Sequence, residues 1–169
     1  PVIGADAADK IRQYIEIGKQ EGKLELGLEP VVAQAWGKPL VGPHIFSGIK
    51  PEHRLANEEI FGPVVAVIQA KDFDEALQIA NATPYKLTGG LFSRTPSHIE
   101  RARAEFRVGN LYLNRGCTGA LVGRQPFGGF GMSGIGSKAG GDQYLYQFVE
   151  PRCVTENTMR RGFAPGLMS

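Results

Sequence analysis

Residues 63–113 alternate between strand-like and helix-like segments, and this alternation constrains the fold more than any other feature of the sequence. A near-continuous run of β-branched and apolar residues, Val64–Ile68, is typical of a strand buried on both faces. The segments that follow are a helix capped by Asp72 and ended by Asn81 and Pro84, a strand at 87–92, a helix capped by Thr95 with Pro96 at its first position, and a strand at 111–113. The short connections between them predict an α/β fold class with a parallel βαβαβ unit.

The regions on either side of this unit are less regular. Asp6 and Asp9 resemble a capping pair, and apolar residues at helical spacing predict an amphipathic helix over 7–18. Glycines and prolines interrupt residues 22–48, which predicts short strands and loops there. Residues 144–149 are strand-like, and a loose tail is expected after Pro151.

Composition and charge exclude several classes of function. With 169 residues, 42% hydrophobic and 21% charged, the chain is long enough for one domain with a core. A net charge of +2 without a basic patch argues against a nucleic-acid partner, and no apolar run reaches the roughly 18 residues of a membrane span. Cys117 and Cys153 form no CxxC pair and have no histidine at metal-ligand spacing, so we expect no metal site and a reducing, cytoplasmic setting.

A glycine-rich loop is the strongest candidate for a site. Residues 116–141 hold ten of the 23 glycines and begin just after the last predicted strand, where open α/β sheets bind ligands. Glycines leave N–H groups free to point at an anion, and Gly119-Ala120 and Gly128-Gly129 are candidates for that role. An alternative is that these glycines only serve tight packing or a mobile loop, and spacing does not decide between the two. Gly129–Gly134 matches the pattern GxGxxG, but it neither follows a strand nor opens a helix, so we interpret the match as a false positive.

Other polar residues give weaker signals. His44, His53 and His98 are scattered, which favours surface histidines. Cys117 has Arg115 nearby but no histidine to act as its base, so it is weak evidence for a nucleophile. Glu58 and Glu59 could be a solvated acid pair beside a core phenylalanine, Phe61.

Several motifs together resemble the aldehyde dehydrogenase family. Residues 57–64 read NEEIFGPV, which is similar to the family's EEIFGPV motif, and residues 81–85 read NATPY. Further motifs in family order are GNLYLNR at 109–115, TGALVG at 118–123, QPFGG at 125–129 and MSG at 132–134. The combination NR, TGALVG and QPFGG most resembles the L-glutamate γ-semialdehyde (1-pyrroline-5-carboxylate) dehydrogenases, including the dehydrogenase half of bifunctional proline-utilisation proteins.

This resemblance implies a role for five residues. Glu59 would hydrogen-bond the nicotinamide ribose of NAD, and Phe61 would pack against the same end of the cofactor. Gly119 and Ala120 would anchor the carboxylate of a small aldehyde substrate through main-chain N–H groups, and Phe127 would line its aliphatic chain. The full protein would use a cysteine thiolate, pass hydride to NAD and hydrolyse the thioester to give L-glutamate, a step in proline catabolism.

The sequence also departs from the family pattern. No Gly-Gln-x-Cys stretch occurs, so the resemblance places no catalytic residue in this chain, and the general base and Rossmann-type cofactor domain would lie upstream. We therefore expect the isolated chain to have no dehydrogenase activity. Lys86 stands where the family usually has the glycine of Tyr-Gly-Leu, and its effect is not evident from the sequence.

The expected organisation has three parts. The chain begins at Pro1 and its first methionine is Met132, so we expect part of a longer protein. Residues 1–141 would be the C-terminal part of a catalytic domain, 142–157 an oligomerisation strand that joins subunits into a homo-oligomer, and 158–169 a tail. Two alternatives stay open: a non-catalytic assembly module, and an aldehyde dehydrogenase of other substrate specificity.

Overall fold

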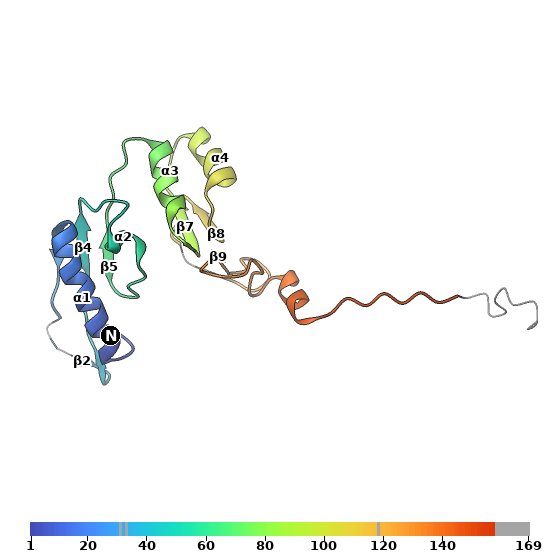
Figure 1. Cartoon of the computed structure of the whole chain (residues 1–169), viewed down its shortest axis with the longest axis horizontal. Helices are drawn as coiled ribbons and strands as arrows, with labels where there is room; N and C mark the ends of the chain where they lie inside the picture. Colours follow the sequence, from blue (N-terminus) through green and yellow to red (C-terminus); the bar gives the residue numbers. More distant parts are fainter. Residues whose placement is uncertain (31, 33, 118, 158–169) are drawn as a thin grey trace, which may run out of the picture.

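The computed structural model describes residues 1–30, 32, 34–117 and 119–157, which form two groups of elements followed by an extended C-terminal segment (Figure 1). The first group is helix α1 (Ala5–Glu21) against a sheet in the order β1-β4-β5, with the one-turn helix α2 (Arg54–Asn57) nearby. The strands of this sheet are β1 (Lys23–Gly27), β4 (His44–Ser47) and β5 (Val64–Ala66). A small hairpin of β2 (Gln34–Ala35) and β3 (Lys38–Pro39) connects β1 to β4.

Helix α1 forms because one of its faces is apolar and closes the first core. Ile11 and Ile15 are buried with Phe46 and Ile49 of the β4 region, and Gly18 is so close to the ring of Phe46 that a Cβ there would lie 2.8 Å from it. The predicted helix over 7–18 is therefore confirmed. The predicted capping pair is wrong, because the helix already begins at Ala5 with Gly4 as its N-cap, and Asp9 instead pairs with Arg12 at 2.8 Å.

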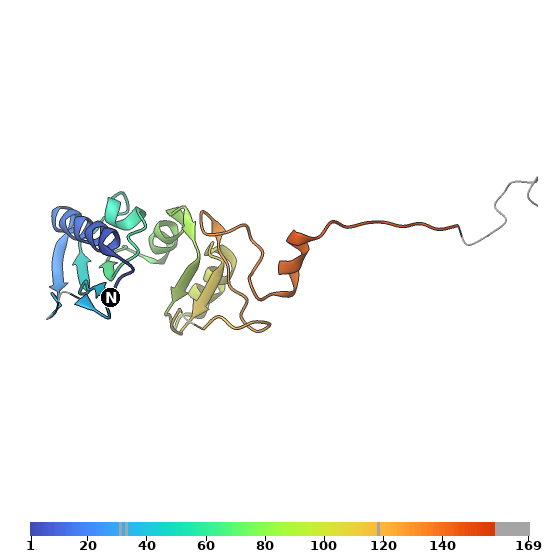
Figure 2. The same cartoon turned by 90° about the horizontal axis from the view of Figure 1, so that it is seen from below.

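The second group contains the remaining predicted helices (Figure 2). Its helices are α3 (Phe73–Ala82) and α4 (Pro96–Glu105), and its strands are β6 (Tyr85–Lys86), β7 (Thr88–Leu91), β8 (Asn110–Leu113) and β9 (Phe130–Gly131). Strands β7 and β8 are parallel, and β9 returns antiparallel to β6. Leu77 and Ala102 are the buried residues of the two helices, and the rings of Phe73 and His98 stack between them at 4.1 Å.

The predicted βαβαβ unit is only partly correct. All five segments occur in the predicted order, but β5 pairs with β4, whereas β7 and β8 pair only with each other, so the parallel unit is β7-α4-β8. The reason is that β4 supplies a parallel partner for β5, and the short-range pattern of a strand does not specify which sheet it joins. As the last strand of its sheet, β5 is not buried on both faces, and Val65 is 52% exposed.

The C-terminal region also differs from the prediction. The strand expected at 144–149 is wrong: Asp142–Phe148 form a 3₁₀ helix, η1, in which the rings of Tyr144 and Phe148 meet edge to face at 5.5 Å. That contact excludes an extended strand, because a strand rises about 3.3 Å per residue and would place two residues four positions apart roughly 13 Å from each other. Residues 149–157 have no regular structure and extend away from the rest of the chain (Figure 1), and the expected tail at 158–169 lies outside the described residues. None of the helices in the described part is long and apolar enough to cross a membrane.

Candidate functional site

The segment between α2 and β5 presents an aromatic ring and a carboxylate to solvent. Phe61 is 82% exposed and has a left-handed backbone, with φ of 60°. This conformation is strained for a bulky residue and is found mainly where a function requires it. The neighbouring Glu59 is also exposed, and its backbone carbonyl accepts a hydrogen bond of 2.7 Å from Lys10. The alternative of a core phenylalanine is therefore wrong, whereas both glutamates of the expected acid pair, Glu58 and Glu59, are exposed.

Phe61 also borders a cavity of about 400 Å³. Ile60, Gly62 and Pro63 line one side of it, and residues from the N-terminus and α1 line the other. An exposed aromatic ring beside an apolar wall offers a surface for a planar ring, and the Glu59 carboxylate beside it can accept hydrogen bonds from hydroxyl groups. Together they offer groups that a planar ring and an attached sugar would contact.

The glycine-rich loop begins where the sequence predicts, beyond the carboxyl ends of two parallel strands. Asn114, the residue after β8, has a φ of 53° and ties the strand ends together. Its side chain accepts from the Ser93 N–H at 2.8 Å and donates to the Ser93 carbonyl at 3.0 Å. The loop therefore starts from a fixed point at the position where α/β sheets bind ligands.

Gly119 and Ala120 are exposed and lie directly before a closed turn, Leu121–Gln125. Leu121 and Gln125 exchange two backbone hydrogen bonds of 3.1 and 2.7 Å, and the Gly123 N–H donates to the Gly140 carbonyl at 2.8 Å. Gly119 has a φ of 93°, and neither its N–H nor that of Ala120 donates a hydrogen bond among the described residues. Two adjacent free N–H groups at a glycine, next to a closed turn, are an arrangement that can bind anions.

The side chain of Gln125, the last residue of the turn, connects the turn to Gly119. The neighbours of Gln125 define the orientation of its amide: the nitrogen donates to the Gly119 carbonyl, and the oxygen accepts from Arg115 at 2.9 Å. The Arg115 guanidinium in turn lies 5.4 Å from the centre of the Tyr112 ring in β8. The turn is thereby connected to a buried residue of the parallel sheet.

The second pair of candidate glycines has a different role. The Gly128 N–H already donates to the Asn110 side chain at 3.1 Å, and Gly129 is buried, with the place of a Cβ taken by Ser133. The anion site predicted at Gly128-Gly129 is therefore wrong, because packing uses these glycines. Phe127 lies just before them, half-buried, and exchanges two backbone hydrogen bonds with Ala139.

The histidines and cysteines named in the sequence analysis do not extend either the Glu59–Phe61 segment or the glycine-rich loop as a site. His44 is buried, not a surface residue as predicted, because β4 directs it inward and its Nδ1 hydrogen-bonds the Gly42 carbonyl at 2.9 Å. Cys117 is exposed, and its sulfur lies against Gly90 of β7. In the described part of the chain, no three His, Cys, Asp or Glu residues gather as metal ligands.

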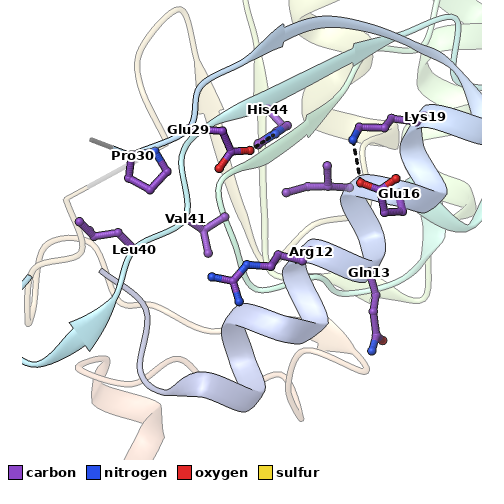
Figure 3. A pocket seen from close by; sticks show the side chains of 10 residues that line it. Arg12, Gln13, Glu16, Lys19, Glu29, Pro30, Leu40, Val41 and His44 are labelled. Atoms are coloured by element: carbon purple, nitrogen blue, oxygen red, sulfur yellow. Dashed lines mark hydrogen bonds and ion pairs between the residues drawn. The ribbon is translucent and has the colours of Figure 1, made fainter. Parts of the chain in front are cut away.

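A larger cavity of about 540 Å³ lies beside α1, away from the predicted residues (Figure 3). Its charged side chains have partners in the fold: Lys19 pairs with Glu16 at 2.7 Å, and Arg12 pairs with Asp9 at 2.8 Å. The five predicted residues do not line it. We therefore interpret it as a groove between α1 and the segment that leads into β4.

Comparison with known proteins identifies the family. A family model described as "Aldehyde dehydrogenase family" matches residues 1–154. The chain belongs to the aldehyde dehydrogenase family. Over 156 residues it is 54% identical to the 1-pyrroline-5-carboxylate dehydrogenase of Geobacillus kaustophilus, covering 92% of this chain and 30% of that protein. The chain thus spans less than a third of the length of this relative.

Solved structures of aldehyde dehydrogenases have the same fold. The 1-pyrroline-5-carboxylate dehydrogenase from Thermus with bound NAD is 53% identical, with a TM-score of 0.82 over 89% of this chain and 28% of that one. Proline utilization A from Bdellovibrio bacteriovorus is 55% identical, with a TM-score of 0.87 over 98% of this chain and 17% of that one.

In this aldehyde dehydrogenase chain, the predicted residues form two separate groups. Glu59 and Phe61 lie together in the first group of elements. Gly119 and Ala120 lie just before the turn Leu121–Gln125 in the second group, with Phe127 further along the same loop. The sequence did not predict the side chains that support these two groups, above all Tyr14, which contacts Glu58, and Gln125, which contacts Gly119. The four-residue spacing of Arg54 and Glu58 was a usable signal for an ion pair, but nothing local connected that pair to α1.

Proposed function

We propose that the complete protein is an NAD-dependent dehydrogenase that oxidises L-glutamate γ-semialdehyde to L-glutamate in proline catabolism. This chain would contribute the substrate-carboxylate anchor and the nicotinamide-ribose contacts. The observation that carries the proposal is the pair of free N–H groups at Gly119 and Ala120, in a chain 54% identical to a 1-pyrroline-5-carboxylate dehydrogenase. Few aldehydes carry the α-carboxylate that such an anchor would select.

Each residue has a task that its surroundings support. The N–H groups of Gly119 and Ala120 bind the substrate carboxylate, and the half-buried Phe127 packs along the carbon chain. These contacts hold the aldehyde carbon at a fixed distance from the anchor. The Glu59 carboxylate accepts hydrogen bonds from ribose hydroxyls and Phe61 packs beside it, and NAD, when bound, supplies the hydride acceptor.

The nucleophile is proposed to come from residues outside these 169. Neither Cys117 nor Cys153 lies in a Gly-Gln-x-Cys sequence, and Cys117 lies against β7 in the segment before the anchor turn. The isolated chain should accordingly form no NADH from the semialdehyde. NADH formation by this chain alone would contradict that part of the proposal.

The experiment compares two aldehydes with the complete protein. L-glutamate γ-semialdehyde carries the α-carboxylate, and an aliphatic aldehyde of the same chain length lacks it. In Gly119→Val, which places a side chain on a left-handed backbone, kcat/KM for the semialdehyde should fall about 10- to 100-fold because carboxylate hydrogen bonds are lost. Activity on the simple aldehyde should change little.

A matched control separates the anchor from general loop strain. Gly136 lies in the same loop with a φ of 104° and open space around it, so Gly136→Val introduces similar backbone strain away from the anchor. Its preference between the two aldehydes should match that of the unsubstituted protein. Equal losses on both aldehydes in Gly119→Val would argue against a carboxylate anchor at this turn.

Assembly into a homo-oligomer through residues 142–157 is part of the same proposal. Leu145, Tyr146 and Phe148 of this segment are exposed, and so are Val149 and Val154 beyond η1. Contiguous apolar side chains of this kind mark a surface that another chain covers. A second copy of the protein is the proposed partner.

A further inference from the structure

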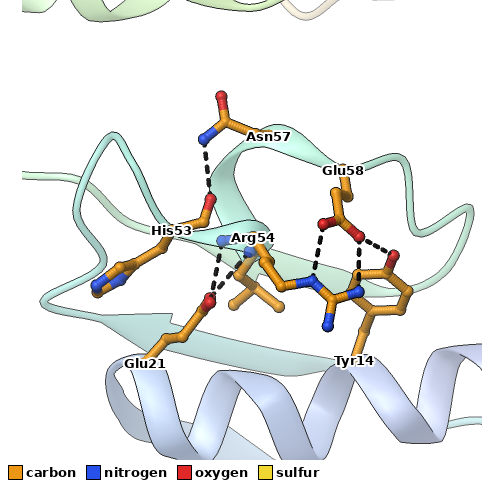
Figure 4. Close-up of polar contacts among 7 residues, drawn as sticks. Tyr14, Glu21, His53, Arg54, Asn57 and Glu58 are labelled. Carbon is orange, nitrogen blue, oxygen red and sulfur yellow. Dashed lines mark hydrogen bonds and ion pairs between the residues drawn. The ribbon is translucent and has the colours of Figure 1, made fainter.

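One face of α1 contacts the segment that carries Glu59 and Phe61, and Figure 4 shows the contacts that Tyr14 and Glu21 make with it. Lys10 donates to the Glu59 carbonyl at 2.7 Å, and the Tyr14 hydroxyl donates to the Glu58 carboxylate. Near the end of the helix, the Glu21 carboxylate accepts from the N–H groups of Arg54 at 3.0 Å and Leu55 at 2.9 Å. Positions 10, 14 and 21 share one face of a helix, so the segment runs antiparallel to α1 along that face.

Arg54 and Glu58 pair with each other, and both contact Tyr14. Arg54 forms two hydrogen bonds with Glu58, of 2.7 and 2.9 Å, and its guanidinium lies 5.6 Å from the centre of the Tyr14 ring. Figure 4 shows the tyrosine below the Arg54–Glu58 pair, with its hydroxyl directed at the carboxylate. Tyr14 therefore supports the pair with both its ring and its hydroxyl.

Helix α2 cannot fix this segment by itself. It has only four residues, and its N-cap residue, His53, makes no side-chain capping bond. Glu21 of α1 caps its first N–H groups instead, which a single isolated turn needs in order to persist. The conformation of the segment is thus determined by α1.

The same helix face holds the backbone on both sides of Phe61. Before it, Lys10 binds the Glu59 carbonyl, and after it, Gly62 is packed so closely on Ile11 that a Cβ would lie 2.5 Å from the Ile11 side chain. Ile11 itself is fully buried. A left-handed phenylalanine persists only where its neighbours are held in this way.

We propose that Lys10, Ile11, Tyr14 and Glu21 of α1 form a template that positions Glu59 and Phe61 for the cofactor. Tyr14 is then a positioning residue that acts through Glu58 and lies outside the lining of the cavity beside Phe61, whereas Lys10 holds the Glu59 backbone and also lines that cavity. The inference rests on the proposed function for the identity of the cofactor. The inference assigns a role at the cofactor site to four residues of α1, which lie more than 35 positions before Glu59 in the sequence.

The test measures NAD binding directly, by calorimetric titration of the complete protein without aldehyde. Tyr14→Phe removes only the hydroxyl, Glu58→Gln weakens the charge pair, and Lys10→Met removes the bond to the Glu59 carbonyl. Loss of one such hydrogen bond should raise the Kd for NAD about three- to tenfold in each variant. The KM for the aldehyde should stay unchanged, because the anchor turn lies in the other group of elements.

Glu16→Gln is the matched control, because it breaks an exposed ion pair of 2.7 Å with Lys19 on the same helix. Its Kd for NAD should equal that of the unsubstituted protein. Unchanged Kd values in both Tyr14→Phe and Glu58→Gln would overturn the inference. So would a rise in the Kd for NAD matched by an equal rise in the KM for the aldehyde, since that is a loss of fold and not of positioning.

The design separates this inference from the proposed function. If the complete protein binds NAD but does not oxidise the semialdehyde, the proposed substrate is wrong and the Kd values still test the template. If it does not bind NAD, the template and the cofactor half of the proposed function both fail.

Discussion

Glu58 and Glu59 are adjacent carboxylates with opposite surroundings. The Glu58 side chain accepts hydrogen bonds from Arg54 and Tyr14, whereas the Glu59 side chain is exposed and only its backbone carbonyl is held, by Lys10. The first glutamate therefore serves the fold, and the second keeps its carboxylate available for a ligand. The sequence presents the two as an equivalent pair, because the difference arises from a helix far away in the chain.

The Glu58 contacts predict a pH dependence of stability. Hydrogen bonds from Arg54, and then from Tyr14, lower the pKa of Glu58 from its ordinary 4.5 to about 2. Because the folded pKa is the lower one, ionised Glu58 stabilises the fold above about pH 4.5, and this contribution is lost as the pH falls toward 2. Thermal unfolding of the complete protein between about pH 5 and pH 3 should show a smaller decrease in Glu58→Gln than in the unsubstituted protein.

Arg54→Met tests whether the Arg54–Glu58 pair causes this pH dependence. It keeps the carboxylate but removes the partner that lowers the pKa of Glu58 most, so its acid dependence should resemble that of Glu58→Gln. If both variants lose stability with acid as steeply as the unsubstituted protein, other carboxylates are responsible and the prediction is wrong.

Lys86, unexplained by sequence alone, closes the end of a helix. Its ammonium group donates to the Asn81 carbonyl at 2.8 Å, in the last turn of α3, where a cation is favourable. We expect Lys86→Met to lower the free energy of unfolding by about 0.5–1 kcal/mol. Lys50→Met, at an exposed lysine outside any helix, should have no effect in the same denaturant titration, and equal losses would remove the assigned role.

At the scale of elements, the two helices of the second group begin in different ways. Asp72 accepts a hydrogen bond of 2.8 Å from the Glu75 N–H and caps α3, whereas Thr95 occupies the N-cap of α4 without a side-chain bond. Sequence reasoning assigned a cap to both. Only Asp72 makes a capping hydrogen bond. A threonine at the N-cap position caps the helix only if its side chain rotates its hydroxyl toward the free N–H groups, and the sequence does not specify that rotation.

This difference predicts unequal costs of truncation. Asp72→Ala should lower the free energy of unfolding by about 1 kcal/mol, while Thr95→Ala should cost only a few tenths. Denaturant titration of the two variants side by side gives the comparison. Similar costs would mean that the Thr95 hydroxyl caps α4 in solution.

The helices of this chain were more predictable than its sheets. Periodic apolar residues specify α1, α3 and α4, since a helix satisfies its hydrogen bonds within one segment. The partner of a strand lies elsewhere in the chain, so the pairing of β5 with β4 and of β6 with β9 left no local signal. The η1 turn was missed for a related reason: Tyr144, Tyr146 and Phe148 have strand-forming side chains, and a contact along the turn overrides that preference.

The candidate site was predictable to the same extent. The position of the loop follows from β8, and the exposed turn at Gly119 follows from its glycine. The packing role of Gly128 and Gly129 was hidden because it depends on Asn110 and on the return of β9 to β6. The contacts of α1 with this segment could not be predicted, because Lys10, Tyr14 and Glu21 bind residues 49, 44 and 34 positions further along the chain.

At the scale of the whole molecule, much apolar surface is uncovered. Large side chains such as Phe92, Val122 and Ile135 are exposed in the second group, in addition to the apolar residues of 142–157. The relatives are more than three times as long as the part that this chain matches. We infer that other regions of the complete protein cover much of this surface, and that residues 142–157 remain for contact with a second copy.

That inference can be tested by two truncations of the complete protein. Ending it after Gly141 removes η1 and the extended residues, whereas ending it after Asn157 removes only the last twelve residues of this sequence. Each large apolar side chain that becomes buried contributes about 1.5–3 kcal/mol, so losing Leu145, Tyr146 and Phe148 should dissociate the assembly.

Sedimentation velocity gives the mass of each form. We expect the protein that ends after Gly141 to sediment as a monomer and the one that ends after Asn157 to keep the mass of the unsubstituted protein. Because a deletion can also unfold a protein, Tyr146→Ser with Phe148→Ser provides a milder version, with circular dichroism as the check on folding. If this folded double variant retains the oligomeric mass, the subunits associate through another surface.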